Sequence, residues 1–242
     1  MNDSMLYKDI SDGAVKDVDT VTGRITGYFS IFGNKDSDGD IIMPGAFKKT
    51  IRENGPKSAK PRILHLLMHD SWKPLAKPDI LKEDSVGLYF EDNISHTTYG
   101  KDTIQLYQDK VLTEHSIGYQ VVKREVDERA EVQKLIELKL WEGSTVSWGA
   151  NMDALVSTVK STDKPSKEAI NLLYQKMDAM EVALKGDYTD DTLRQLEIQF
   201  KQIQQLIISL NRTIEPETST PKTDKPEIDV KWIFETLTKK FK

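Results

Sequence analysis

The pattern of apolar residues changes near residue 160, and this change constrains the fold more than any other feature. Before it, short runs rich in β-branched and aromatic residues are separated by Gly, Pro and Asp, as in GRITGYFSIFG (residues 23–33). After it, apolar residues recur at spacings of three and four, the period of an amphipathic α-helix. We therefore expect an α+β domain over residues 1–160, followed by a helical C-terminal extension.

Within the first 160 residues, the predicted strands outnumber the predicted helices. Two segments have helical spacing, residues 44–54 and 101–112. Strand-like segments are found at residues 23–33, 62–70, 87–95, 116–126 and 132–148. Because the order shows no regular alternation of strand and helix, a mainly antiparallel sheet or barrel is expected.

Residues 161–212 have the pattern of two helices. Gly186 lies between them, where a helix C-cap belongs, and Thr189 or Asp190 can cap the second helix. Each run covers only two to three heptads, so we expect an antiparallel hairpin or an oligomeric bundle rather than a long coiled coil. The apolar positions that define the two runs are Ile170, Leu173, Met177, Met180 and Leu184, then Leu193, Leu196, Phe200, Ile203, Ile207 and Leu210.

The chain is expected to end in a linker and one further helix. Residues 213–227 contain three prolines among polar residues, a composition typical of an extended, mobile linker. Residues 228–242 place apolar side chains near one side of a helix. Such an isolated amphipathic helix is suited to binding in the groove of a partner protein.

Composition excludes several classes of function. The 242 residues contain no cysteine, so disulfides, thiolate nucleophiles and Cys-ligated zinc are excluded, and an intracellular protein is favoured. The net charge of −5 argues against a nucleic-acid-binding surface. The start, MNDSMLYKDI, lacks the pattern of a signal peptide, and no segment approaches the ~20 apolar residues of a membrane span.

A histidine directly precedes a serine in TEHSIGYQ (residues 113–120). Neighbouring side chains of a strand point to opposite faces, so His115 is expected on the apolar face and Ser116 on the other. A general base must come within hydrogen-bond reach of the proton that it removes. If Ser116 is a nucleophile, its base must therefore be another histidine.

His69 and Glu142 are the candidates for the other two members of a triad. His69 follows His65 by four residues, on the same face of the predicted strand, and lies nearer the end of that strand. Glu142 is expected on the apolar face of residues 132–148, where a carboxylate is costly unless it is paired. The alternative is a core histidine, a surface serine and an ion-paired glutamate.

Two further patterns partly resemble metal sites. HLLMH (residues 65–69) has the spacing of a zinc pair but Leu66 where the zinc peptidase motif needs Glu. DSDGD (residues 36–40) lacks the Gly and Glu positions of a calcium loop and indicates an acidic turn. No metal and no cofactor are predicted.

Five segments in the same order resemble the prohead maturation serine proteases of tailed bacteriophages, a family distantly similar to the herpesvirus assemblins. Ala76 and Gly149 stand where that family often has Gly and Pro, and neither is a proposed catalytic side chain. The matching segments are GYFSIFGNKDSDGDIIMPGAF (residues 27–47), LLMHD with KPLA (66–76), GLYFE (87–91), HSIGY (115–119) and LKLWEGSTVSWGANMDALV (138–156).

The resemblance implies a small closed β-barrel ringed by helices and a serine endopeptidase. It implies His69 as base, Ser116 as nucleophile and Glu142 as third member. The substrates would be scaffold protein, the scaffold-like segment of the major capsid protein and the chain itself. The location would be the assembling procapsid in the host cytoplasm.

The C-terminal part allows two other interpretations. The chain could be a non-catalytic scaffold that forms homo-oligomers through its C-terminal helices, or a fusion of protease and scaffold. In a protease, the same extension would target the enzyme into the procapsid and then be removed by self-cleavage in the exposed linker.

Overall fold

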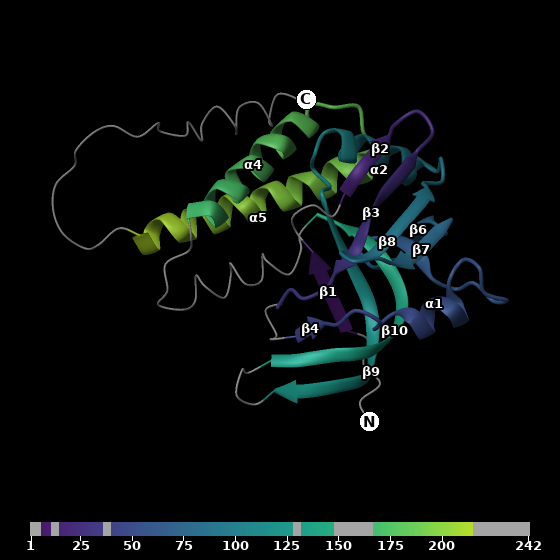
Figure 1. The fold of residues 1–242 in the computed structure, drawn as a ribbon. Helices are drawn as coiled ribbons and strands as arrows, with labels where there is room; N and C mark the ends of the chain where they lie inside the picture. The colour runs from purple at the N-terminus through teal and green to yellow at the C-terminus, as the bar shows by residue number, and fades with distance from the viewer. Residues whose placement is uncertain (1–5, 11–14, 36–39, 128–131, 148–166, 215–242) are drawn as a thin grey trace.

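The structure is a computed structural model that describes residues 6–10, 15–35, 40–127, 132–147 and 167–214 (Figure 1). Residues 36–39 and all residues from 215 on lie outside the described residues. Most of the predicted acidic turn (residues 36–40), most of the predicted linker and the predicted terminal helix fall in these segments.

The first sheet contains the two longest strands of the chain at its centre. Its order is β1-β9-β10-β5-β6, and β4 pairs with β10 off this path. The neighbours of β9 are antiparallel to it, whereas β4 and β5 run parallel to β10. The strands of this sheet are β1 (Leu6–Ile10), β4 (Asp40–Ile42), β5 (Leu64–Leu67), β6 (Asp70–Ala76), β9 (Glu114–Asp127) and β10 (Val132–Val146).

The second sheet is antiparallel throughout and has the order β2-β3-β8-β7. Its strands alternate buried and more exposed residues, as Leu88, Phe90 and Asp92 show by pointing inward. The strands are β2 (Val15–Asp19), β3 (Arg24–Ile31), β7 (Ile80–Glu83) and β8 (Gly87–Asn93).

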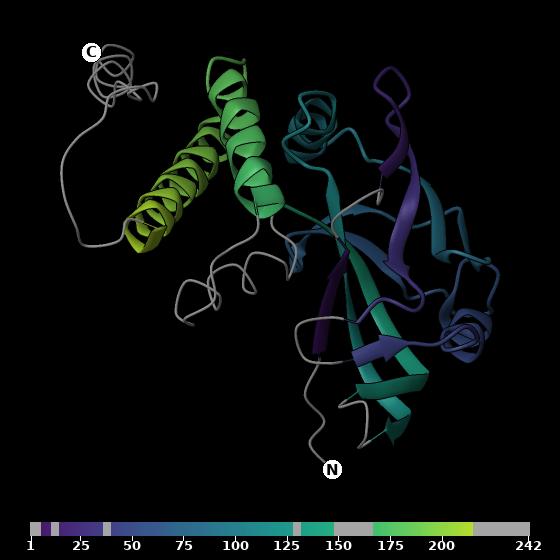
Figure 2. The ribbon, with the colours of Figure 1, turned by 60° about the vertical axis from the view of Figure 1, so that its left-hand side comes forward.

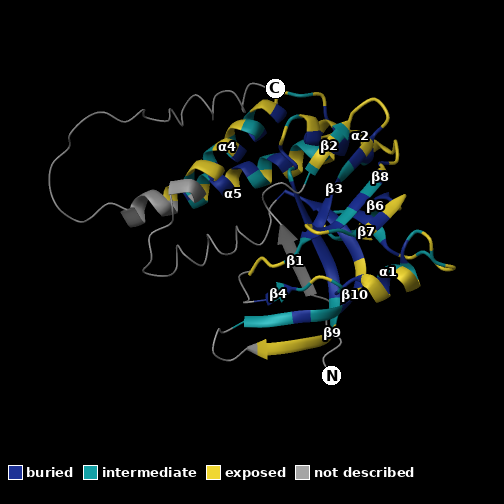
Figure 3. Cartoon of the chain, in the orientation of Figure 1, coloured by how far each residue is buried: buried dark blue, intermediate teal, exposed yellow. Residues whose placement is uncertain are grey.

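The mixed α+β class is confirmed, but the described strands do not close into the expected barrel. Pairing in the first sheet ends at β1 and β6, and pairing in the second ends at β2 and β7. The two sheets instead pack against each other through side chains, so that the core lies between them (Figure 3).

Aromatic rings fill the space between the sheets. Phe29 of β3 and Phe90 of β8 are stacked with ring centroids 3.9 Å apart, and both meet the rings of His65 and His115 edge-on. The backbone of β10 approaches this stack at Gly143, where an added Cβ would lie 2.4 Å from the Phe29 ring. Any side chain at this position would have to displace the Phe29 ring or the strand.

Four helices complete the described structure. The short α1 replaces the longer helix predicted over residues 44–54, because residues 44–47 form a turn. Figures 1 and 2 show α4 and α5 side by side at one end of the sheets. No helix among the described residues has the length and apolarity needed to cross a membrane. The helices are α1 (Lys48–Asn54), α2 (Thr98–Gln108), α4 (Lys167–Ala183) and α5 (Asp190–Ile214).

Buried polar contacts attach α4 and the start of α5 to the sheets and to α2. Lys176 of α4 donates to the Glu114 carboxylate and, at 2.8 Å, to the Ser147 carbonyl oxygen. Thr189, which caps α5 by accepting from the Thr192 amide, also donates to Asp102 Oδ2 of α2 at 2.5 Å. The Lys176 contacts join the ends of β9 and β10, next to the predicted site residues.

Candidate active site

Glu142 leaves β10 on the face opposite to the one predicted. Leu140 pairs with Tyr119 and Glu142 pairs with Gly118, so two residues of β10 oppose one of β9, which is a β-bulge. The bulge reverses the alternation of side chains. Leu140 therefore points into the core, and Glu142 points to the other side of the sheet.

His69 lies in a tight turn rather than on a strand. The strand β5 ends at Leu67, β6 begins at Asp70, and these two residues pair. Met68 and His69 form the two-residue connection with φ values of 54° and 56°. Two-residue hairpin turns of the primed type require positive φ, which Gly and Asn adopt more easily than Met or His. The turn thus stores strain next to His69, as functional sites often do.

The turn brings His69 to the polar face of β10. His69 Nδ1 lies 2.8 Å from Glu142 Oε1, and Ser144 donates to Glu142 Oε2 at 2.5 Å. Ser144 Oγ also accepts from the His69 backbone N–H at 3.3 Å. The Glu142 side chain is buried at 6% exposure, whereas the His69 side chain is 22% exposed. A partly accessible imidazole is therefore oriented by a buried carboxylate.

Ser116 lies on the same face as this cluster. It pairs directly with Ser144 across β9 and β10, and directly paired residues of an antiparallel ladder share a face. Ser116 is fully buried, and its Oγ has no hydrogen-bond partner among the described residues. The fold thus places His69, Ser116 and Glu142 at one end of three neighbouring strands.

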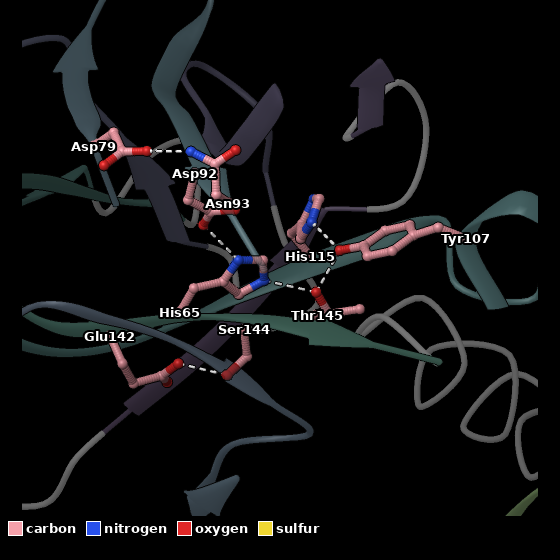
Figure 4. Close-up of polar contacts among 9 residues, drawn as sticks. All are labelled: His65, Asp79, Asp92, Asn93, Tyr107, His115, Glu142, Ser144 and Thr145. Carbon is pink, nitrogen blue, oxygen red and sulfur yellow. Dashed lines mark hydrogen bonds and ion pairs between the residues drawn. The ribbon is translucent and has the colours of Figure 1, made fainter. Parts of the chain in front are cut away.

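The other histidines of these strands point the opposite way. His115 is buried and bonds to Tyr107, which confirms that it faces away from Ser116. His65 Nδ1 is hydrogen-bonded to Asp92, and His65 Nε2 is hydrogen-bonded to Thr145 (Figure 4). The prediction that His65 and His69 share a face was therefore wrong. The ring nitrogens of His65 are thus engaged inside the protein, and no group of three or more His, Cys, Asp or Glu in the described part could hold a metal.

Sequence reasoning missed Ser144, which touches both His69 and Glu142. Its signal is the spacing of two from Glu142, which places both on one face of a strand. Arg124 of β9 lies eight residues along the strand from Ser116 and donates to Gln133 at 2.8 Å, so it does not join this cluster.

Comparison with known proteins identifies the family of the chain. The family model described as Caudovirus prohead serine protease matches residues 11–168, which include the proposed site residues. The chain belongs to this family. Among similar proteins of the family, the prohead protease of Enterobacteria phage HK97 is 34% identical over 145 residues, which cover 58% of this chain and 62% of the HK97 protein.

A second relative and one solved structure extend the comparison. The prohead protease of Escherichia phage T5 is 27% identical over 154 residues, covering 62% of this chain and 71% of the relative. The bacteriophage T4 capsid assembly protease aligns with a TM-score of 0.45 and 16% identity, over 60% of this chain and 97% of the T4 chain. The match to the HK97 protein thus spans less than two thirds of that relative's length.

Proposed function

We propose that the chain is a serine endopeptidase with Ser116 as nucleophile, His69 as general base and Glu142 as the group that orients the base. The observation that carries this proposal is the 2.8 Å contact between His69 Nδ1 and Glu142 Oε1, on the face of the sheet where Ser116 lies. A histidine bound through Nδ1 to a carboxylate is fixed in the tautomer whose Nε2 accepts a proton.

The proposed reaction is acyl transfer. Ser116 Oγ attacks the scissile carbonyl carbon while His69 Nε2 takes the hydroxyl proton. The tetrahedral intermediate collapses when His69 returns this proton to the leaving amine, and an acyl-enzyme is formed. Water, deprotonated by His69, then attacks the ester carbonyl. His69 returns this proton to Ser116 Oγ as the bond to the acyl group breaks, and the new carboxyl terminus is released. Glu142 stabilises the imidazolium in both steps.

Ser144 would serve as a support for this pair. Its hydroxyl proton is directed at Glu142 Oε2, and its oxygen accepts from the backbone of His69. It therefore fixes both partners of the His69–Glu142 contact. Because its proton is directed at a carboxylate rather than at the imidazole, Ser144 is the weaker candidate for the nucleophile.

In this structure the proposed nucleophile, Ser116, is not hydrogen-bonded to its proposed base, His69. Ser116 Oγ is buried and makes no hydrogen bond among the described residues. Hydrogen bonds between catalytic groups are often long without substrate and shorten in the reactive complex. We infer that binding of a substrate, or of a substrate-like probe, uncovers Ser116 and brings it to His69.

The family name supports a substrate in the assembling capsid. We infer cleavage of scaffold protein, or of the scaffold-like segment of the major capsid protein, within the procapsid in the host cytoplasm. We also propose self-cleavage in the linker predicted at residues 213–227. The division into a protease domain (residues 1–160) and a helical extension, and oligomerisation through the C-terminal helices, belong to the same proposal.

The test is expression of the wild type, Ser116→Ala and Ser144→Ala, followed by intact-mass measurement. Wild type should shorten at a defined bond, Ser116→Ala should stay whole, and Ser144→Ala should be cut more slowly at the same bond. Cutting of Ser116→Ala at the wild-type rate would exclude Ser116 as the nucleophile. Intact Ser144→Ala together with cut Ser116→Ala would transfer that role to Ser144.

The alternative is a scaffold protein, which would form oligomers through α4 and α5. Their buried attachment through Lys176 and Thr189 to the strand ends and α2 makes them part of the same folded body as the site. This favours a protease with an integrated helical extension over a separate scaffold module. A scaffold without protease activity would leave all three proteins whole even after assembly with coat subunits.

A further inference from the structure

A chain of five buried polar side chains lies on the core side of the strands that carry the proposed site (Figure 4). Asp92 Oδ2 is 2.7 Å from His65 Nδ1, and His65 Nε2 is 2.6 Å from Thr145 Oγ1. Thr145 bonds in turn to the Tyr107 hydroxyl, which lies 2.9 Å from His115 Nε2. We call these five residues the buried relay.

The buried relay connects five different elements. Asp92 comes from β8 in the second sheet and Tyr107 from α2, whereas the others come from three strands of the first sheet. Four of the five are fully buried and Tyr107 is 5% exposed. Polar groups in such a position are costly unless they are hydrogen-bonded, so the relay is a specific tie between the two sheets and α2.

The protons of the buried relay have one consistent arrangement when both histidines are neutral. An ionised Asp92 only accepts, so His65 carries its proton on Nδ1 and accepts through Nε2. Thr145 must then donate to His65, and Tyr107 must donate to Thr145. Burial raises the pKa of Tyr107, which keeps the phenol protonated and able to donate. His115 completes the order by donating from Nε2 to the Tyr107 oxygen.

The pairing of β9 with β10 places the buried relay on the face of the sheet opposite to the proposed site. His115 pairs with Thr145 across β9 and β10, and the next pair along the ladder is Ser116 with Ser144. His115 is therefore followed along β9 by Ser116, and Thr145 is preceded along β10 by Ser144. Because side chains alternate, the two relay residues point to one face of the sheet and their two neighbours to the other. A shift of β9 along β10 would therefore break the relay and misplace Ser116 at the same time.

We propose that Thr145 and Tyr107 are positioning residues, and that the buried relay holds β9 against β10 so that Ser116 stays in register with the His69–Glu142 pair. This inference rests on the proposed function. Asp92, His65 and Thr145 have the order of a hydrolase triad, but the His65 side chain is fully buried, whereas the His69 side chain is 22% exposed. Their role is therefore to position and not to react.

The test compares wild type with Thr145→Val, Thr145→Ser and Tyr107→Phe in the full chain. Valine keeps the shape of threonine but leaves His65 and Tyr107 without their common partner. A fluorophosphonate probe reports the reactivity of Ser116, with Ser116→Ala as the blank. Its maximal rate of modification should fall roughly 10- to 100-fold in Thr145→Val, because small displacements of a reacting group have effects of this order.

Three controls separate positioning from a loss of folding. The probe's binding constant should stay within about twofold of wild type, Thr145→Ser should return to within about threefold, and Tyr107→Phe should show a smaller loss because the Thr145–His65 contact survives. Modification of Thr145→Val at the wild-type rate would overturn the proposal. So would a loss that only follows the fraction of unfolded protein, or a failure of serine to restore the rate.

A second measurement does not depend on activity. The chain has four histidines, so its imidazole ¹⁵N NMR spectrum is simple enough to assign with single His→Gln variants. The relay predicts that Thr145→Val changes the ring signals of both His65 and His115, while those of His96 stay unchanged. If the probe fails to modify wild type at all, the proposed function fails. The histidine signals then still test whether the buried relay exists. An unchanged His115 would then disprove the relay.

Discussion

Two histidine–carboxylate pairs of nearly the same geometry lie on opposite sides of the same strands. His69 Nδ1 is 2.8 Å from Glu142 Oε1, and His65 Nδ1 is 2.7 Å from Asp92 Oδ2. The His69 side chain is 22% exposed, whereas both members of the inner pair are fully buried. Hydrogen-bond geometry thus does not distinguish a reactive pair from an internal one. The exposure of the histidine does, and it supports the proposal that the outer pair is reactive and the inner pair is structural.

The largest expected effect is on catalysis by the outer pair. His69→Gln should lower the rate of Ser116 modification about 10²–10⁴-fold, the usual contribution of a general base, with little change in the free energy of unfolding. The matched change His65→Gln should lower this rate much less, through its place in the buried relay, and should also lower the free energy of unfolding. Fluorophosphonate labelling and urea unfolding of both variants measure the two quantities. Equal activity losses in both, at equal stability, would contradict the assignment of roles.

The next effect concerns stability through the inner pair. Asp92→Ala should lower the free energy of unfolding by about 3–5 kcal/mol, because it removes one partner of a buried pair that joins the two sheets. The control is Glu91→Ala, which removes the half-buried partner of the exposed Arg24 from the same strand and should cost less than ~1 kcal/mol. Equal costs measured by urea denaturation would show that the inner pair contributes no more than a surface contact.

A smaller effect is expected at Gly143, where the backbone of β10 lies against the Phe29 ring. Gly143→Ala should lower the free energy of unfolding by about 1–3 kcal/mol, because the new methyl group overlaps the Phe29 ring. Phe29→Leu in the same chain should reduce this cost by making room. A double-mutant cycle from thermal unfolding measures the coupling. Strictly additive effects would mean that the strand, rather than the ring, moves to accept the methyl group.

The smallest effect concerns the strained turn of the outer pair. Met68→Gly should raise the free energy of unfolding by about 1 kcal/mol, because glycine adopts the positive φ of this position without strain. Lys110→Gly should give a similar gain, since its φ of 58° is also positive, but it lies away from the site. Only Met68→Gly should also alter Ser116 modification. A change of activity in both variants would argue against a special role for strain at His69.

The periodic pattern of the sequence was sufficient for the long elements and for one decision about the site. The strands β9 and β10 and the helices α4 and α5 follow segments whose spacing predicted them. Alternation along β9 also placed His115 in the core and Ser116 on the other face, as the structure has them. These features depend on local periodicity, which one sequence displays directly.

Other features could not be inferred from local pattern. The short β1, β2, β4 and β7 carry too few residues to show a period, and β1 and β4 are stabilised by pairing with β9 and β10, which are distant in sequence. The bulge after Leu140 reversed the face on which Glu142 lies. The contact of His65 with Asp92 joins residues 27 apart, and its contact with Thr145 joins residues 80 apart.

The sequence by itself determined the α+β class, the helical extension and the residue types available for a serine-based site. The tertiary structure decided which histidine meets which carboxylate, and which of the two pairs remains accessible. The physical reason is that side-chain periodicity is local, whereas a bulge, a two-residue turn and the packing of two sheets depend on contacts between distant segments. In this chain, those three features separate the outer His69–Glu142 pair from the inner His65–Asp92 pair.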